Sequence, residues 1–397
     1  MKALSGRTAG FTDSVIRRMT RISAKYGALN LSQGFPDFDP PGAITQRLAE
    51  IAATGPHQYA LTWGAQNFRE ALARKQSRYM GRPIDPDREI VTTCGSTEAM
   101  MAAMMTVANP GDKVVVFSPF YENYGADAVL SGAEPLYVPL HPPSGIHGPA
   151  GPEFSFRLGE LEAAFKQKPK ALILCNPSNP CGKVFRKEEL EIIADFAEKY
   201  DCYVITDEVY EHIVYEPHRH IYFSSLPGMA ERTLSCSSLS KTYSITGWRL
   251  GYIIAPERII DVAKKVHDFL TVGAAAPLME AVIPALEFGE DYYDTLKREY
   301  TERRDLLMRG LDGLGIAHTH PEGAYYIMLD ISEYGCENDL RFCEELAAKT
   351  GIGAVPGSSF FREKVNHLIR LHFAKKIETL NEALNRLEGM KAAMKKN

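Results

Sequence analysis

From about residue 90 onward, short and almost wholly apolar runs alternate with amphipathic stretches. Strands made of such runs have both faces buried, which is typical of a mostly parallel sheet covered by helices. Residues 187–199, between two of these runs, place Leu190, Ile193, Ala194 and Ala197 on one helical face. We therefore expect an α/β fold with a seven-stranded sheet and a ligand crevice outside the carboxyl ends of its strands. The predicted strands are Ile90–Cys94, Val114–Phe117, Leu136–Val138, Ala171–Cys175, Cys202–Thr206, Thr233–Cys236 and Gly251–Ala255.

The length of 397 residues exceeds one ordinary hydrophobic core and predicts two packed domains. After about residue 287 the chain changes character, because Asp291–Leu314 has the pattern of one long charged helix and short strands follow near Tyr325–Leu329 and Ile369–Phe373. The loop His141–Pro152 is rich in Pro and Gly and is a candidate mobile surface element. We divide the chain into an N-terminal arm with part of a small domain (residues 1–45), a large domain (46–286) and a small α+β domain (287–397).

The composition argues against several classes of protein. Hydrophobic residues make up 45% of the chain, charged residues 24%, and the formal net charge is -5, as expected for a soluble globular protein without a nucleic-acid or membrane partner. No run approaches the roughly 20 apolar residues that span a bilayer, and the N-terminus has no signal-peptide shape. The seven scattered cysteines form no C-x-x-C pair, so we expect reduced thiols in a cytoplasmic protein and no metal site.

The strongest chemical signal is a lysine in a polar setting. Lys241 follows the predicted strand 233–236, with Ser238 and Ser240 just before it and Arg249 eight residues after it. A lysine at a strand end can simply point into solvent, but serine hydroxyls and an arginine together form a pocket able to bind phosphate. A lysine that is partly desolvated beside another cation has a lowered pKa, so it is available as a free amine near neutral pH.

Other polar and aromatic residues also come directly after predicted strands. Asp207 ends one strand, where it could serve only as a helix N-cap, and Asn179 lies in an Asn-Pro turn after another. The segment Gly95–Thr97 opens a predicted helix, whose N-terminal amides favour phosphate. Tyr121 follows a further strand, at a place where an aromatic side chain is more often part of the core than a ligand contact.

The segment Ser238–Gly251 resembles the lysine motif of class I/II aminotransferases at every restricted position, and the other motifs extend the similarity from about residue 30 to 373. Aspartate/aromatic, kynurenine/glutamine and methionine aminotransferases are the subgroups that the chain resembles most. The resemblance implies the fold type I of enzymes that use pyridoxal 5'-phosphate (PLP), with PLP as cofactor. One departure is Cys181, where the family usually has threonine.

The resemblance also implies a role for each motif residue. Lys241 would be the catalytic lysine that forms a Schiff base with PLP and moves the substrate proton. Asp207 would face the pyridine nitrogen and keep it protonated, so that the ring acts as an electron sink. Tyr210 and Asn179 would donate to the ring 3'-oxygen, and Tyr121 would stack on the ring. The residues implied for the phosphate are Gly95, Ser96, Thr97, Ser238, Ser240 and Arg249.

Further positions resemble family residues that face the substrate or a second subunit. Gly34 matches a glycine whose backbone N–H meets the substrate carboxylate, and Asn179 belongs to the same site. Arg370 matches the small-domain arginine that clamps this carboxylate with two hydrogen bonds, and its apolar neighbours argue against a surface charge. Tyr59 resembles a tyrosine that reaches the phosphate of the neighbouring subunit, which implies a homodimer.

Together these features predict a transaminase that moves the amino group of an L-amino acid to a 2-oxo acid, 2-oxoglutarate by family habit, in ping-pong fashion. The donor is left open among aspartate, aromatic and other large amino acids, because no second arginine for a distal carboxylate is evident. A C–S β-lyase or another PLP reaction on the same fold remains the alternative. We do not expect a regulatory domain fused to a DNA-binding domain, because too few residues precede the first motif. The aromatic residues near motif positions are Tyr59, Trp63, Tyr121, Tyr243, Tyr325, Tyr326 and Phe360.

Overall fold

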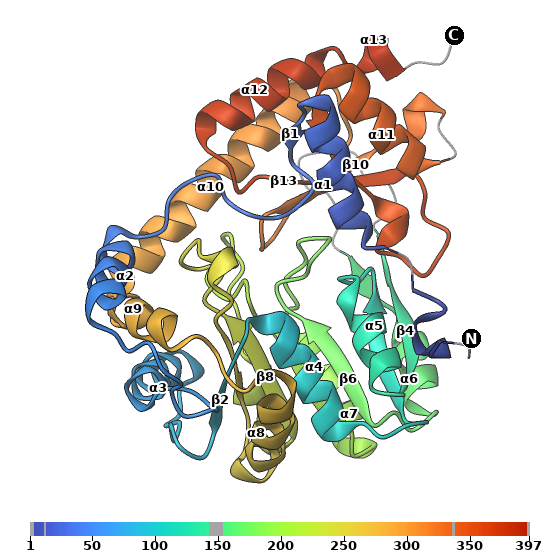
Figure 1. Cartoon of the computed structure of the whole chain (residues 1–397). Helices are drawn as coiled ribbons and strands as arrows, with labels where there is room; N and C mark the ends of the chain where they lie inside the picture. Colours follow the sequence, from blue (N-terminus) through green and yellow to red (C-terminus); the bar gives the residue numbers. More distant parts are fainter. Residues whose placement is uncertain (1–3, 12, 143–153, 336–337, 395–397) are drawn as a thin grey trace.

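The computed structural model describes residues 4–11, 13–142, 154–335 and 338–394. Its central feature is an eight-stranded, mostly parallel sheet in the order β2-β9-β8-β7-β6-β3-β4-β5 (Figure 1). Strands β8, β7, β6, β3 and β4 pair in parallel, β9 is antiparallel to both of its neighbours, and β5 is antiparallel to β4. The strands are β2 (Ile90–Thr93), β3 (Lys113–Ser118), β4 (Glu134–His141), β5 (Ser155–Phe156), β6 (Ala171–Cys175), β7 (Tyr203–Asp207), β8 (Thr233–Ser238) and β9 (Gly251–Ile254).

All seven predicted strands are present, and most end within two residues of the expected positions. Strand β4 is longer than the predicted Leu136–Val138. The prediction was too short because Pro135 and Pro139 flank that run, and proline cannot donate to a ladder and is uncommon inside strands. The eighth strand, β5, has two residues, which is too short for any periodicity in the sequence. From residue 143 onward, the predicted loop His141–Pro152 lies outside the described residues.

The apolar strands are buried on both faces, as their composition predicts. On β3, Val114 and Val116 share one core with α4 and α8, whereas Val115 and Phe117 share another with α6 and α7. The four apolar side chains predicted to face the core from residues 187–199, which form α7, are all buried. The helices around this sheet are α2 (Gly42–Thr54), α3 (Gln66–Met80), α4 (Ser96–Val107), α5 (Asn123–Leu130), α6 (Leu158–Phe165), α7 (Lys187–Lys199), α8 (Glu257–Thr271) and α9 (Ala276–Leu286).

A smaller group of elements, orange, red and, for residues 15–30, blue in Figure 1, packs against one end of the large sheet. It holds the sheet β10-β13-β12 and the parallel pair β1-β11. The N-terminal arm joins this group, because Met19 and Leu31 share a core with Ile327 and Leu371. The predicted division of the chain at residues 46 and 287 stays a prediction. The elements are α1 (Val15–Tyr26), β1 (Leu29–Asn30), α10 (Glu290–Gly313), β10 (Tyr326–Asp330), α11 (Asp339–Thr350), β11 (Ile352–Gly353), β12 (Val355–Pro356), β13 (Leu368–His372), α12 (Ile377–Glu388) and α13 (Met390–Met394).

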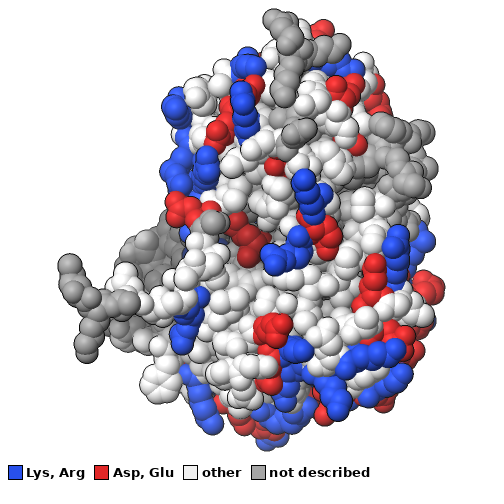
Figure 2. All heavy atoms as spheres, turned by 90° about the vertical axis from the view of Figure 1, so that its right-hand side faces the viewer, with Lys and Arg blue, Asp and Glu red and all other residues white. Residues whose placement is uncertain are grey.

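The small sheet faces the carboxyl ends of β6 and β7. Arg370 on β13 donates to Asn179 in the loop after β6, and Tyr326 on β10 lies within hydrogen-bond distance of Tyr210 in the loop after β7. The face shown in Figure 2 carries basic side chains interspersed with acidic ones. Within the described ranges, no helix is long and apolar enough to cross a membrane.

Candidate active site

Lys241 lies three residues beyond β8, in the position that the motif predicts. Its Nζ donates to the carbonyl oxygen of Gly34 at 3.4 Å and lies 5.9 and 5.8 Å from the ring centroids of Tyr210 and Tyr325. Burial, and secondarily the charge of Arg249, lower the pKa of this amine to about 8. At pH 7 about a tenth of such an amine is free, far more than for a lysine with the ordinary pKa, and the free form is able to react with an aldehyde.

A cradle for an anion lies beside Lys241, where the N-terminus of α4 meets the segment before β9. Gly95 precedes α4 with φ 84°, and a Cβ placed there would come closer than 3.0 Å to the guanidinium of Arg249. The hydroxyl of Ser240 is buried and has no hydrogen-bond partner within the described part of the chain. N-terminal helix amides, a guanidinium and a spare hydroxyl together fit a phosphate group.

Asp207 ends β7 and is buried in the middle of the large sheet. Tyr124 donates its hydroxyl to Oδ2 of Asp207 at 2.7 Å, and the backbone N–H of Val209 donates to Oδ1 at 3.4 Å. Burial raises the pKa of Asp207, while the bond from Tyr124 lowers it. A buried carboxylate of this kind is stabilised by a cation placed against it, as a protonated pyridine nitrogen would be.

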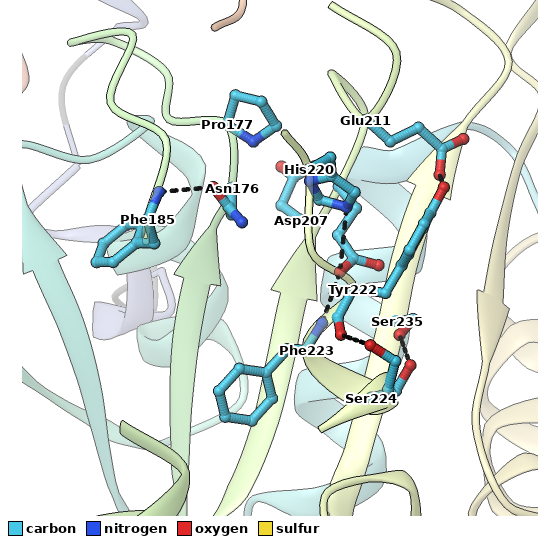
Figure 3. Close-up of polar contacts among 12 residues, drawn as sticks. Asn176, Pro177, Phe185, Asp207, Glu211, His220, Tyr222, Phe223, Ser224 and Ser235 are labelled. Carbon is cyan, nitrogen blue, oxygen red and sulfur yellow. Dashed lines mark hydrogen bonds and ion pairs between the residues drawn. The ribbon is translucent and has the colours of Figure 1, made fainter. Parts of the chain in front are cut away.

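Behind Asp207, the segment after β7 is held by buried polar contacts (Figure 3). Tyr222 donates its hydroxyl to Glu211 at 2.7 Å, and Glu208 lies 3.7 Å from His220. Burial raises the pKa of Glu208 to about 8 and lowers that of His220 to about 4. Burial thus favours the neutral form of both side chains beside Asp207.

Arg370 lies on β13 and is 1% exposed. One terminal nitrogen donates to Oδ1 of Asn179 at 2.6 Å and the other to the carbonyl oxygen of Ser32 at 2.9 Å. Its guanidinium carbon lies 4.2 Å from the ring centroid of Tyr326 and 4.5 Å from that of Phe360. Its Nε has no hydrogen-bond partner among the described residues, and no carboxylate of that part of the chain pairs with it. A buried cation in this state fits an incoming carboxylate.

Gly34 lies beside Lys241, at a position where only glycine fits. A Cβ at this position would come closer than 3.0 Å to the side chains of Tyr325 and Tyr326. Its carbonyl oxygen accepts from Lys241 and from the hydroxyl of Tyr325, the latter at 2.9 Å. The predicted substrate residues Gly34, Asn179 and Arg370 are thus brought together with Lys241.

Three of the aromatic residues near motif positions do not join this cluster. Tyr243 is buried in another core, where its hydroxyl meets that of Tyr293 at 2.9 Å, and Trp63 packs beside Lys264. Tyr59 is 88% exposed. Sequence reasoning missed Tyr124, whose signal is its place one helical turn after the predicted ring contact: the rings of Tyr121 and Tyr124 lie 5.8 Å apart, edge to face.

Comparison with known proteins agrees with this geometry. The model of the family "Aminotransferase class I and II" matches residues 26–387. The chain belongs to this family. Because class I/II aminotransferases depend on PLP, this aminotransferase is a PLP-dependent transaminase, and the anion cradle, the buried carboxylate and the lysine described above fit that cofactor. Within the described ranges, no group of His, Cys, Asp and Glu side chains is arranged to hold a metal.

Individual relatives resemble this aminotransferase along nearly their whole length. Methionine aminotransferase from Escherichia coli is 35% identical, over 94% of this chain and 95% of its own. Kynurenine–oxoglutarate transaminase 3 from Mus musculus is 33% identical, over 95% and 88%. The solved structure of N-succinyldiaminopimelate aminotransferase from Mycobacterium tuberculosis superposes with a TM-score of 0.92 at 34% identity, covering 97% of this chain and 99% of that one.

Proposed function

We propose that this aminotransferase holds PLP between Lys241, Asp207 and the cradle of Gly95 and Arg249. When bound, PLP supplies an aldehyde that condenses with amines and a ring that accepts electron density from the substrate Cα. The observation that carries the proposal is the partly buried amine of Lys241, with a pKa lowered to about 8, beside the anion cradle. The implied roles of Ser96, Thr97, Ser238 and Ser240 at the phosphate are part of the same proposal.

Lys241 is proposed as the general base and acid of the reaction. Its amine removes the proton from the substrate Cα and returns it to the cofactor side, which requires a free amine at the operating pH. The lowered pKa supports this role, and the carbonyl oxygen of Gly34, 3.4 Å away, holds the amine on the side of the substrate clamp.

Three other side chains are proposed to set the charge on the cofactor ring. Asp207 keeps the ring nitrogen protonated, while Tyr210 and Asn179 donate to the ring 3'-oxygen. The contact of Asn179 with Arg370 supports its part, because arginine has no acceptor atom and so the amide oxygen must face it. The amide nitrogen of Asn179 is then free to donate. The proposed stacking partner of the ring is Tyr121.

Arg370 is proposed to bind the α-carboxylate of donor and acceptor in turn. A single carboxylate clamp serves both half-reactions, so amino acid and oxo acid compete for one site, as ping-pong kinetics require. The Nε of Arg370, which has no partner among the described residues, supports this role, and so do the rings of Tyr326 and Phe360 close to its guanidinium.

We infer that the preferred donors are L-amino acids with large uncharged side chains. Tyr121, Tyr326 and Phe360 line the region around Arg370, and Arg370 itself is committed to the α-carboxylate. The charge of Glu122, next to Tyr121, raises the pKa of that tyrosine after burial and disfavours a distal carboxylate nearby. The name of the mouse relative supports 2-oxoglutarate as acceptor.

We also propose a homodimer in which Tyr59 reaches the phosphate of the partner subunit. Five exposed apolar side chains form what we call the apolar patch, and their exposure supports burial against a second copy. Two segments build the patch and lie side by side, because His267 meets the carbonyl oxygen of Thr62 at 2.8 Å. The patch also adjoins the anion cradle, since Cys94 donates its thiol to the carbonyl oxygen of Gly273. The members of the patch are Tyr59, Leu61, Phe269, Leu270 and Val272.

Borohydride reduction of the PLP-loaded protein, followed by peptide mapping, tests the assignment of the lysine. We expect the label on the peptide that contains Lys241, no label and nearly no turnover in Lys241→Ala, and normal labelling in Lys265→Ala, which changes an exposed lysine on α8. A label on another peptide would refute the assignment.

The reaction and the substrates are tested with a panel of amino donors and 2-oxoglutarate. A transaminase forms glutamate and the donor's oxo acid, whereas a C–S β-lyase releases ammonia and pyruvate. We expect methionine and aromatic donors to exceed aspartate in kcat/KM; preference for aspartate would contradict the donor assignment. A cytoplasmic location is also proposed, supported by the free thiols of Cys94, Cys175, Cys181, Cys202 and Cys236.

A further inference from the structure

Tyr326 occupies the point where the cofactor side and the substrate side of the site meet. It begins β10, pairs in register with His372 of β13, and is 3% exposed. Its hydroxyl oxygen lies 2.8 Å from the hydroxyl oxygen of Tyr210, and its ring lies 4.2 Å from the guanidinium carbon of Arg370. The same hydroxyl faces Gly34 so closely that any side chain there would collide with it.

We propose that Tyr326 is a positioning residue for both halves of the site: its hydroxyl donates to Tyr210, and its ring holds the guanidinium of Arg370 in a fixed plane. The inference rests on the proposed function, because it requires Tyr210 at the cofactor and Arg370 at the substrate carboxylate.

The direction of the hydrogen bond between Tyr210 and Tyr326 follows from the number of protons and lone pairs on each hydroxyl. A phenol has one O–H to donate and lone pairs to accept. If Tyr210 gives its proton to the ring 3'-oxygen, only its lone pairs remain for its neighbour, so Tyr326 is the donor between the two. A hydroxyl that accepts a hydrogen bond becomes a stronger donor itself. Tyr326 thereby strengthens the bond from Tyr210 to the cofactor.

The ring of Tyr326 acts on Arg370 by a separate contact. The guanidinium lies over the rings of both Tyr326 and Phe360, and its two terminal nitrogens donate to Asn179 and Ser32. Aromatic faces attract a guanidinium, and a desolvated pair is worth more than an exposed one. Two rings and two acceptors thus fix the guanidinium, so its remaining N–H groups, Nε–H among them, point in set directions, which is what a carboxylate needs for a defined pose.

Two substitutions separate the hydroxyl from the ring. Tyr326→Phe removes the hydroxyl and keeps the ring, whereas Tyr326→Leu removes both. The matched control is Tyr300→Phe, because the buried hydroxyl of Tyr300 in the same core has no hydrogen-bond partner within the described part of the chain. For each variant we would titrate the pH-dependent absorbance of bound PLP and measure the Kd of 3-phenylpropanoate, a carboxylate without an amino group.

For Tyr326→Phe we expect the pKa of the absorbance change to rise by about 0.5 unit, because the donor to the 3'-oxygen is weakened. The Kd of 3-phenylpropanoate should stay within about twofold of the wild-type value, since the ring contact remains. For Tyr326→Leu we expect the same rise in pKa and a Kd that is about 3- to 10-fold higher. Tyr300→Phe should behave as the wild type in both measurements.

Each other result contradicts a stated part of the inference. An unchanged absorbance pKa in Tyr326→Phe would refute the role of the hydroxyl, and equal Kd values for Tyr326→Leu and Tyr326→Phe would refute the role of the ring. A pKa shift of the same size in Tyr300→Phe would show a general loosening of the core instead of positioning. If the wild-type protein showed no pH-dependent absorbance with PLP, the proposed function itself would fail, and the inference with it.

Discussion

Arg370 is a buried charge without a carboxylate partner in the described part of the chain. Such a charge lowers the stability of the free protein and favours binding of an anionic ligand. The two terminal nitrogens of Arg370 donate to Asn179 and Ser32, and these two acceptors hold the guanidinium in place. Desolvation lowers the pKa of Arg370, but arginine stays protonated at any pH of interest. The energetic gain from neutralising this charge would therefore become available to a carboxylate that binds beside it, as we propose for the substrate.

Truncation of Arg370 should therefore weaken binding of both substrates. We expect Arg370→Ala to raise the KM of amino acid and oxo acid by about 100-fold or more, because a buried charge-assisted pair is lost, and to leave PLP bound. Arg370→Lys keeps the charge but cannot donate two parallel hydrogen bonds, so its KM values should lie between those of the wild type and Arg370→Ala. Steady-state kinetics and the absorbance of bound PLP check this; loss of PLP with unchanged KM would show that Arg370 serves the cofactor.

The low pKa of Lys241 has a cost in stability that depends on pH. At pH 7 the amine is mainly protonated in both the folded and the unfolded chain, and the folded chain bears the desolvation of the charge. Between about 8, the folded pKa, and 10.5, the ordinary value, the unfolded chain binds more protons than the folded one. Stability therefore rises with pH through this window.

Removal of the amine should reveal that cost. We expect cofactor-free Lys241→Met to be more stable than the cofactor-free wild type by about 2 kcal/mol at pH 7, and the difference to shrink toward zero as the pH rises from 8 to 10. Urea unfolding at a series of pH values measures it. A difference that did not change with pH would mean that packing, not the charge, causes it.

At the scale of elements, the contact between the N-terminus of α4 and the start of β9 builds the anion cradle. Gly251 lies in β9 against the backbone of Gly95, and a Cβ at Gly251 would come closer than 3.0 Å to backbone atoms of that residue. Arg249, between η4 (Thr246–Trp248) and β9, adopts the left-handed conformation with φ 56°, which turns its side chain toward Gly95. The cradle thus depends on two backbones touching without side chains between them.

A methyl group at this contact should damage the cradle. We expect Gly251→Ala to destabilise the protein by about 1–3 kcal/mol, because backbone atoms cannot move aside as a side chain does, and to weaken PLP binding by about 10-fold or more. Gly247→Ala is the matched control four residues earlier, since a Cβ there meets nothing within 4 Å. Thermal unfolding and PLP titration compare them; equal behaviour would contradict the close-contact argument.

At the scale of the whole molecule, the apolar patch around Tyr59 and Phe269 is the surface that we propose a second copy covers. Phe269 is 91% exposed on α8, four residues before Gly273, whose carbonyl oxygen accepts from the thiol of Cys94. In a two-fold dimer the same side chain is buried in both subunits, so its contribution to the free energy of association counts twice. Burying a phenylalanine side chain stabilises by about 1.5–3 kcal/mol, which places several kcal/mol of the proposed dimer in this one position.

A charge at this position should separate the subunits. We expect Phe269→Glu to raise the dimer dissociation constant by about 100-fold or more and to weaken PLP binding, because Tyr59 of the partner subunit leaves the phosphate. Leu158→Glu, at an exposed leucine on α6, is the control and should leave both properties unchanged. Analytical ultracentrifugation measures the association; a wild-type protein that sediments as a monomer at all concentrations would refute the proposed dimer.

The sequence by itself determined the large sheet and the residues that follow its strands. Alternation of apolar runs and amphipathic helices is a local property, and parallel strands bring their carboxyl ends to one edge, so Lys241, Asp207 and Asn179 had to lie near one another.

Only the tertiary structure decided which distant side chains touch. Asn179 and Arg370 are 191 positions apart, Tyr210 and Tyr326 are 116 apart, and Tyr124 and Asp207 are 83 apart. No local pattern encodes such contacts, because they arise when the small sheet and α5 pack against the large one. The pKa of Lys241 was decided at the same level, since its largest cause is burial, and burial is set by the elements that close over a residue.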